Sequence, residues 1–158
     1  MYRKYCSQIG LEMLLPEAIF DQMKEVCRRY YPKESGGVLV GHIENGATAV
    51  VELMIVPKWF YSTPVFFSRK AAHINRRLQS IWKRSNGATH YLGEWHCHPN
   101  MTSSYSGTDF KAMTDIASNP KIRMKNPIMM IIGYTPSEFA ETVYVFIDSI
   151  LYTYERKI

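Results

Sequence analysis

Three residues in the second half of the chain could together hold a metal ion. His96 and His98 are two positions apart, and in an extended chain such residues point to the same face. Pro99 favours extended backbone angles at His98, so both imidazoles can converge on one ion. Asp109 falls at the start of a predicted helix and could add an oxygen ligand. Two histidines and one carboxylate, with water as fourth ligand, are typical of a catalytic zinc site.

The residues around Asp109 also have a second interpretation. Ser106 and Asp109 are three positions apart, and this spacing is typical of a capping box at a helix N-terminus. Taken alone, the segment favours the cap. Five residues are specified at fixed offsets: two histidines, a proline, a serine and an aspartate. This combination would occur by chance on the order of once in 10⁵ chains of this length. The combination therefore favours a metal site, and one helix start can be both capped and ligating.

A hydrolase that works through a metal and water needs a nearby group to accept and return a proton. Glu34 lies at the entry to an apolar predicted strand, and the alternative for it is a solvated loop residue. Glu94 precedes His96 by two positions and shares its strand face. The residue types and spacing alone do not choose between these two carboxylates.

Hydrophobic spacing and turn signals predict the elements that position these residues. Helices are predicted from Pro16 to about residue 30, over 68–84 with Asn86-Gly87 as its end, and over 109–117. Strands are predicted at 36–43 and 47–56 around an Asn45-Gly46 turn, at 91–96, at 128–134 and at 142–147, with a strand or helix at 150–154. Residues 57–67 are predicted to form a loop or irregular edge. This alternation predicts an α/β (α+β) sandwich around one mixed sheet.

Composition narrows the class of protein. The 158 residues fit a single domain spanning 1–158. Three cysteines without a CxxC pair argue against a disulfide framework and suit the cytoplasm. No apolar run approaches the roughly 20 residues that span a bilayer, and we expect no membrane or nucleic-acid partner. The net charge of +5 is concentrated in the predicted helix 68–84, which we interpret as a solvated face, with contact to an acidic partner as the alternative.

The segment His96-Cys97-His98-Pro99 is followed by Ser106-x-x-Asp109, with seven residues between His98 and Ser106. Together the two segments resemble the JAMM motif of the JAB/MPN metalloproteases. The upstream pattern Pro32-x-Glu34-x-x-Gly37-x-Leu39-x-Gly41 is similar to the segment that carries the family's catalytic glutamate. The resemblance covers roughly residues 16–147. It implies a cytidine deaminase-like fold with a central mixed sheet flanked by helices, and one Zn²⁺ per chain held by His96, His98, Asp109 and water.

The resemblance also implies roles for the remaining site residues. Glu34 would be the general base that activates the water and then protonates the leaving amine, and Glu94 would have no such role. Ser106 would stabilise the tetrahedral oxyanion. The chain departs from the motif at Cys97, where the family usually has Ser or Thr. By strand alternation its side chain points away from the metal, and we interpret it as a small buried residue.

Residues 91–99, Tyr-Leu-Gly-Glu-Trp-His-x-His-Pro, are most similar to the stand-alone bacterial JAB proteins encoded beside E1/E2-like proteins in CBASS anti-phage operons. This likeness implies a deconjugating isopeptidase, related to deubiquitinases. It would cleave the amide bond after the C-terminus of a conjugated cGAS-like nucleotidyltransferase. The alternative is a JAB peptidase that processes a ubiquitin-like or sulfur-carrier protein. A non-catalytic MPN scaffold is disfavoured because the full ligand set and Glu34 are present.

Family members that this chain resembles bind an extended C-terminal tail by strand addition. The aromatic segment 59–67 is the best candidate for a flap that pairs with such a tail, with Trp59, Phe60 and Phe66 as substrate-binding residues. The alternative is that these three side chains pack onto the core.

Overall fold

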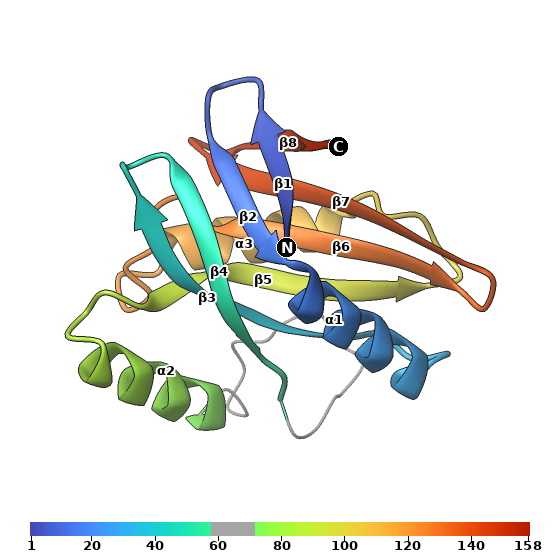
Figure 1. Cartoon of the computed structure of the whole chain (residues 1–158), viewed down its shortest axis with the longest axis horizontal. Coiled ribbons are helices and arrows are strands. Elements are labelled where there is room, and N and C mark those ends of the chain that lie inside the picture. Colours follow the sequence, from blue (N-terminus) through green and yellow to red (C-terminus); the bar gives the residue numbers. More distant parts are fainter. Residues whose placement is uncertain (58–71) are drawn as a thin grey trace.

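Eight strands and three helices make up the part of the chain that the computed structural model describes, residues 1–57 and 72–158 (Figure 1). The strands are β1 (Tyr2–Ser7), β2 (Glu12–Pro16), β3 (Ser35–Glu44), β4 (Thr48–Ile55), β5 (His90–Pro99), β6 (Ile128–Thr135), β7 (Glu138–Ile147) and β8 (Ile150–Lys157). The helices are α1 (Glu17–Tyr30), α2 (Ala72–Arg84) and α3 (Gly107–Ser118).

The strands form one mixed sheet in the order β1-β2-β4-β3-β5-β6-β7-β8, and β8 also pairs with β1. Only β2 with β4 and β5 with β6 run parallel, while the remaining neighbours are antiparallel. β5 therefore lies in the interior of the sheet, between β3 and β6, and runs beside β6 through the middle of Figure 1. The predicted mixed sheet with flanking helices is confirmed.

The two faces of the sheet bury two different sets of apolar side chains. On one side, Met130 and Ile132 of β6 pack with the buried residues of α1, among them Phe20 and Met23. On the other side the alternate β6 residues pack against α2 and α3, in a cluster that includes Ile74, Met113, Ile116, Met129 and Ile131. Successive β6 side chains thus point to opposite faces of the sheet, and helices cover both faces.

Local sequence signals correctly predicted the positions of several elements. α1 begins directly after Pro16, and its inward residues recur at helical spacing. Asn45 and Gly46 have φ values of 50° and 69° and form the tight turn between β3 and β4, as their sequence predicted. α2 ends before Asn86-Gly87, as predicted, and the structure describes this helix from residue 72. The proposed substrate contacts Trp59, Phe60 and Phe66 lie outside the described residues.

Several elements differ from the sequence prediction. The N-terminal hairpin of β1 and β2 was not predicted, because charged and polar residues interrupt its apolar ones and its outer partners, β8 and β4, are distant in sequence. β5 continues to Pro99 and includes His98, because it pairs with β6 up to Tyr134. β7 begins at Glu138, four residues earlier than predicted, and residues 150–157 form a strand.

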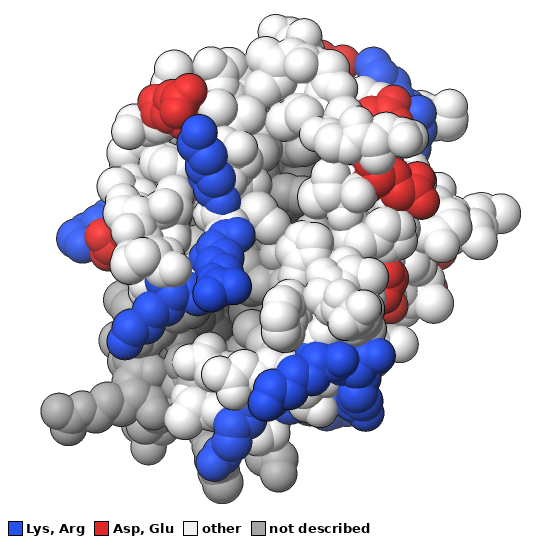
Figure 2. All heavy atoms as spheres, turned by 90° about the vertical axis from the view of Figure 1, so that its left-hand side faces the viewer, with Lys and Arg blue, Asp and Glu red and all other residues white. Residues whose placement is uncertain are grey.

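Positive charge is concentrated on one face. Residues 53–93 and 116–137 contain ten of the nineteen lysines and arginines and no aspartate or glutamate. Four exposed cations of α2 form no ion pair with another described residue; they are Arg76, Arg77, Lys83 and Arg84. Figure 2 views the side of the molecule on which α2 lies, and Lys and Arg predominate there. The expected solvated basic face is confirmed for residues 76–84.

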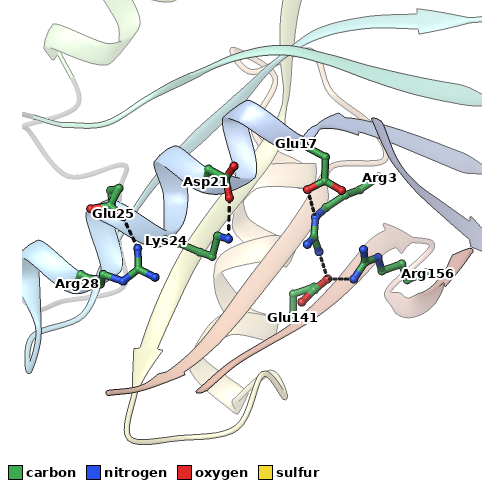
Figure 3. Close-up of polar contacts among 8 residues, drawn as sticks. All are labelled: Arg3, Glu17, Asp21, Lys24, Glu25, Arg28, Glu141 and Arg156. Atoms are coloured by element: carbon green, nitrogen blue, oxygen red, sulfur yellow. Dashed lines mark hydrogen bonds and ion pairs between the residues drawn. The ribbon is translucent and has the colours of Figure 1, made fainter. Parts of the chain in front are cut away.

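A network of charged side chains ties the N-terminal strand to α1 and β7. Arg3 of β1 pairs with Glu17, at 2.8 Å, and with Glu141 of β7, which also accepts a contact from Arg156 (Figure 3). Only 11% of the Arg3 side chain and 14% of the Glu141 side chain are exposed. The Arg3 guanidinium also lies 3.7 Å from the centre of the Phe20 ring. The network therefore adds charged contacts among β1, α1, β7 and β8, which also share one apolar core cluster.

We expect Glu141→Gln to lower the free energy of unfolding by about 2 kcal/mol, because it removes the charge that partners a largely buried guanidinium. Glu25→Gln is the matched control, since Glu25 pairs with Arg28 on the exposed side of α1 and 65% of its side chain is exposed. That change should cost no more than about 0.5 kcal/mol. Urea unfolding of the two variants checks this, and equal losses would show that the network contributes nothing beyond a surface pair.

Candidate metal centre

The three residues singled out from the sequence come together where β5 ends and α3 begins. His96, His98 and Asp109 each offer a ligand atom, and these atoms lie within 4.8 Å of one another. Nε2 of His96 is 3.1 Å from Oδ1 of Asp109, and Nε2 of His98 is 3.6 Å from Oδ2. Ligands at zinc's usual bond length in tetrahedral geometry are about 3.4 Å apart. The spacing of the ligand atoms therefore fits a small metal ion.

The hydrogen bonding of the two imidazoles also fits a metal. Nε2 of His96 is buried and has no hydrogen-bond partner, although Oδ1 of Asp109 lies close to it. A buried polar atom without a partner is costly unless something else satisfies it. Nδ1 of His98 lies 3.3 Å from the carbonyl oxygen of Thr102, which fixes the proton on Nδ1 and leaves Nε2 free to ligate.

The electrostatics hold two of the ligands, His98 and Asp109, in the protonation states that a metal needs. Burial lowers the pKa of His98, and the nearby His96 lowers it further, against the opposing effects of Asp109, Thr102 and Glu34. Burial alone would raise the pKa of Asp109, but contacts with His96 and Ser106 outweigh it and hold that pKa well below its usual range. Near neutral pH the centre therefore presents a neutral His98 and an ionised Asp109.

Ser106 caps α3 as the sequence predicted. Its hydroxyl accepts a hydrogen bond from the Asp109 amide at 3.2 Å and donates one to Oδ2 of Asp109 at 2.7 Å. The Ser106 amide donates to the same carboxylate oxygen at 2.6 Å, which completes the capping box. One helix start thus orients the carboxylate by its own cap. Ser106 is exposed, and its hydroxyl could donate a hydrogen bond to a substrate only after giving up the one that it donates to Asp109.

Glu34 lies beside the cluster because of the pairing between β3 and β5. Ser35 is paired with Cys97 and Gly36 with His96 in this antiparallel ladder. Glu34 directly precedes this ladder, and the same register extended by one residue brings it to the level of His98. Glu34 is exposed, and its negative charge acts to raise the pKa of His98. An exposed carboxylate beside the ligands can exchange protons with water.

Glu94 occupies a different environment. It is 6% exposed, and its carboxyl accepts a hydrogen bond from the Tyr91 hydroxyl at 3.4 Å. Burial raises the pKa of Glu94 to about 8. Its carboxyl group is therefore mostly protonated at neutral pH and lies within the core that α2 and α3 cover. This environment is unsuited to a proton acceptor.

Cys97 lies on the opposite face of β5 from the ligands, in the core cluster that includes α1 residues. Its partner there is Cys27 of α1, whose pKa is raised by the contact with Cys97 and by burial. The interpretation of Cys97 as a small buried residue agrees with this position. The contact of Thr102 with His98 could not be predicted from the sequence, because a backbone carbonyl carries no residue-specific signal.

Comparisons with known proteins agree with this fold and identify its family. The family model of prokaryotic homologues of the JAB domain matches residues 16–145, and the chain belongs to this family. A CD-NTase/cGAS isopeptidase of Enterobacter hormaechei subsp. hoffmannii is 32% identical over 127 residues, covering 79% of this chain and 69% of that protein. A probable metalloprotease of Sinorhizobium fredii is 26% identical over 127 residues, covering 79% and 77%.

Among solved structures, the solution structure of a protein from Desulfitobacterium hafniense is similar in fold, with a TM-score of 0.63. Its sequence is 19% identical, and the match covers 89% of this chain and 86% of that one. The expected JAB/MPN fold and the expectation of a hydrolytic enzyme are confirmed by the family and by its named relatives. The ligand cluster and the metalloprotease relative are consistent with a metal. No helix among the described residues is long and apolar enough to cross a membrane.

The protonation of Glu94 predicts how stability depends on pH. The folded protein holds this proton up to about pH 8, whereas the carboxyl in an unfolded chain loses it near its ordinary value of 4.5. The contribution of the Glu94 proton to the free energy of unfolding is therefore fully present below pH 4.5. It is lost as the pH rises from there to about 8, by up to about 1.4 kcal/mol per pH unit.

Glu94→Gln has no such proton and keeps a partner for Tyr91. In chelator-treated protein we expect the difference in unfolding free energy between Glu94→Gln and the wild type to grow steadily between pH 5 and pH 8, in favour of the variant. Urea titrations across this range measure the difference, and a constant value would contradict a buried, protonated Glu94.

The ligand set predicts metal stoichiometry. We expect His96→Ala and Asp109→Ala each to lower the bound metal to well below one ion per chain, because two ligands hold zinc far less tightly than three. Elemental analysis after purification and dialysis measures this. His90→Ala, on the same strand but eight residues from His98, is the matched control and should keep the full stoichiometry. Unchanged metal content in both ligand variants would exclude this site.

Proposed function

We propose that the chain is a zinc-dependent isopeptidase that cleaves the amide bond after the C-terminus of a conjugated protein, and that the conjugated protein is a CD-NTase. The observation that carries the proposal is the convergence of two imidazoles and one carboxylate at the C-terminal end of β5, in a chain of the JAB family. The substrate class rests on the relative from Enterobacter hormaechei, which is named a CD-NTase/cGAS isopeptidase.

In the proposed site, His96, His98 and Asp109 hold the zinc ion. When bound, zinc would polarise the scissile carbonyl and make a nearby water more acidic. Asp109 supplies the negative charge, and the cap of α3 keeps its carboxylate aimed at the imidazoles. The carbonyl of Thr102 keeps Nε2 of His98 directed to the same point.

Glu34 is the proposed proton carrier. It accepts a proton from the water as the water oxygen bonds to the carbonyl carbon. It then donates that proton to the leaving nitrogen as the C–N bond breaks. Its exposure and its position at the level of His98 support this role. Ser106, adjacent to the cluster, is the proposed hydrogen-bond donor to the oxyanion that develops on the carbonyl oxygen.

We propose that residues 1–158 act as one JAB/MPN domain and that the segment containing Trp59, Phe60 and Phe66 contacts the substrate tail. E1/E2-like proteins encoded nearby would make the conjugates that this enzyme reverses, as part of anti-phage defence in the cytoplasm. The alternative substrate is a ubiquitin-like or sulfur-carrier protein. The name of the probable metalloprotease from Sinorhizobium fredii specifies no substrate, and we therefore test this alternative as well.

The test uses linear fusions of a folded protein to a C-terminal reporter. One fusion carries a CD-NTase and the other carries a sulfur-carrier protein. We expect the zinc-loaded enzyme to release the reporter from the CD-NTase fusion and a metal chelator to stop the reaction. Cleavage of only the second fusion would favour the alternative. Intact fusions in both arms would overturn the proposed activity.

Glu34→Ala should lower the cleavage rate by about 10²- to 10⁴-fold, because it removes the proton carrier and leaves the three ligands in place. Its metal content should equal that of the wild type. Glu25→Ala, an exposed carboxylate on α1, is the matched control and should cleave normally. The role of Glu34 is rejected if the variant turns over at the wild-type rate with a full complement of metal.

A further inference from the structure

The two elements that carry the ligands are joined by a single short segment, residues 100–106. His98 lies just before it and Asp109 just after it, so the path of this segment sets how the two ligands approach each other. In Figure 1 the segment lies at the right, beyond the arrowhead of β5. We refer to residues 100–106 as the ligand loop.

The ligand loop acts directly on one ligand. The carbonyl of Thr102 is 3.3 Å from Nδ1 of His98. This contact decides which nitrogen carries the proton and how the ring is turned, and outer contacts of this kind tune the affinity of metal sites. The orientation of His98 therefore depends on where the ligand loop holds the Thr102 carbonyl.

The hairpin of β6 and β7 holds the ligand loop in place. The Asn100 amide donates to the Tyr134 carbonyl at 2.7 Å, which continues the pairing of β5 with β6. The hydroxyls of Ser103 and Thr142 are 2.7 Å apart. The Tyr144 hydroxyl donates to the Ser103 carbonyl at 3.4 Å. These contacts lie on both sides of Thr102.

Gly133 of β6 lies directly beneath this part of the loop. A Cβ atom at Gly133 would be 2.7 Å from the Met101 carbonyl oxygen, 2.9 Å from the Ser103 amide nitrogen and 2.9 Å from the Thr102 carbonyl carbon. All three are backbone atoms, which cannot rotate away as a flexible side chain could. Any side chain at this position would therefore displace the backbone that presents the Thr102 carbonyl.

We propose that Gly133 is a positioning residue of the metal centre: its missing side chain lets the ligand loop lie against β6, so that Thr102 orients His98 for metal binding. Gly133 touches neither the metal position nor the substrate, and it acts through the loop. The inference rests on the proposed metal site and extends it to a strand that contributes no ligand. It also gives the β6–β7 hairpin a function beyond completing the sheet.

Gly133→Ala is the test, with Gly107→Ala as the matched control. Gly107 lies between the same two ligands, at the start of α3, but a Cβ there meets no atom within 4 Å. We expect Gly133→Ala to bind Zn²⁺ about 10- to 100-fold more weakly in competition with a chromophoric chelator. Gly107→Ala should bind as the wild type does. The visible spectrum of the Co²⁺-loaded protein should change in Gly133→Ala alone, because it reports the geometry of the ligands.

Equal Zn²⁺ affinity and an unchanged Co²⁺ spectrum in Gly133→Ala would overturn the proposal. If that variant does not fold, Thr142→Val decides, since it removes the bond to Ser103 and leaves Gly133 unchanged. It should weaken Zn²⁺ binding by about tenfold, and wild-type affinity would count against the inference. These measurements need no substrate. A wild-type chain that binds no metal would overturn the proposed function itself, whereas tight wild-type binding with no effect in the variants would overturn only the role of Gly133.

Discussion

The metal centre depends on the pairing of β5 with β3 and β6 along its whole length. His96 and His98 point to one face only while β5 stays extended to Pro99, and the parallel ladder with β6 keeps it so. The antiparallel ladder with β3 brings the residue before Ser35 to the level of His98. A slip of one residue in either ladder would turn the imidazoles into the core that Cys97 now occupies. The register of one interior strand therefore fixes two ligands and the neighbouring carboxylate together.

The third ligand comes from a different element, and its position depends on electrostatics as well as on backbone path. Asp109 is buried, and a buried carboxylate is stable as an ion only with donors or positive charge nearby. The amide and hydroxyl of Ser106 supply two donors from the helix cap. A bound cation would supply the remaining charge, so metal binding and folding reinforce each other at this point. The same residues thus end the loop, start the helix and complete the site.

Much of this arrangement could be predicted from the sequence, and the parts that could not share a physical reason. The spacing of His96, His98 and Asp109 predicted the cluster, and Asn45-Gly46 predicted the hairpin turn, because each signal is local. The strands β1 and β2 escaped prediction because their stability comes from distant partners and from the charged network around Arg3. The contact of Thr102 with His98 uses a backbone atom and leaves no pattern. Gly133, in contrast, is visible in the sequence as an isolated glycine within a strand, and such a glycine indicates close approach of another backbone.

The two candidate carboxylates show how environment divides residues that look equivalent in the sequence. Glu34 and Glu94 both neighbour a ligand, and the resemblance to the JAMM motif alone distinguished them. The structure adds a physical reason. Glu94 lies in an apolar core where burial favours its protonated form, with one hydrogen bond from Tyr91. A group that already holds its proton at neutral pH cannot take one from water. Glu34 is exposed on the solvent side of the same ladder, where its charge is felt by His98. Different environments at two points of one ladder, one buried and one exposed, thus separate a structural acid from a candidate base.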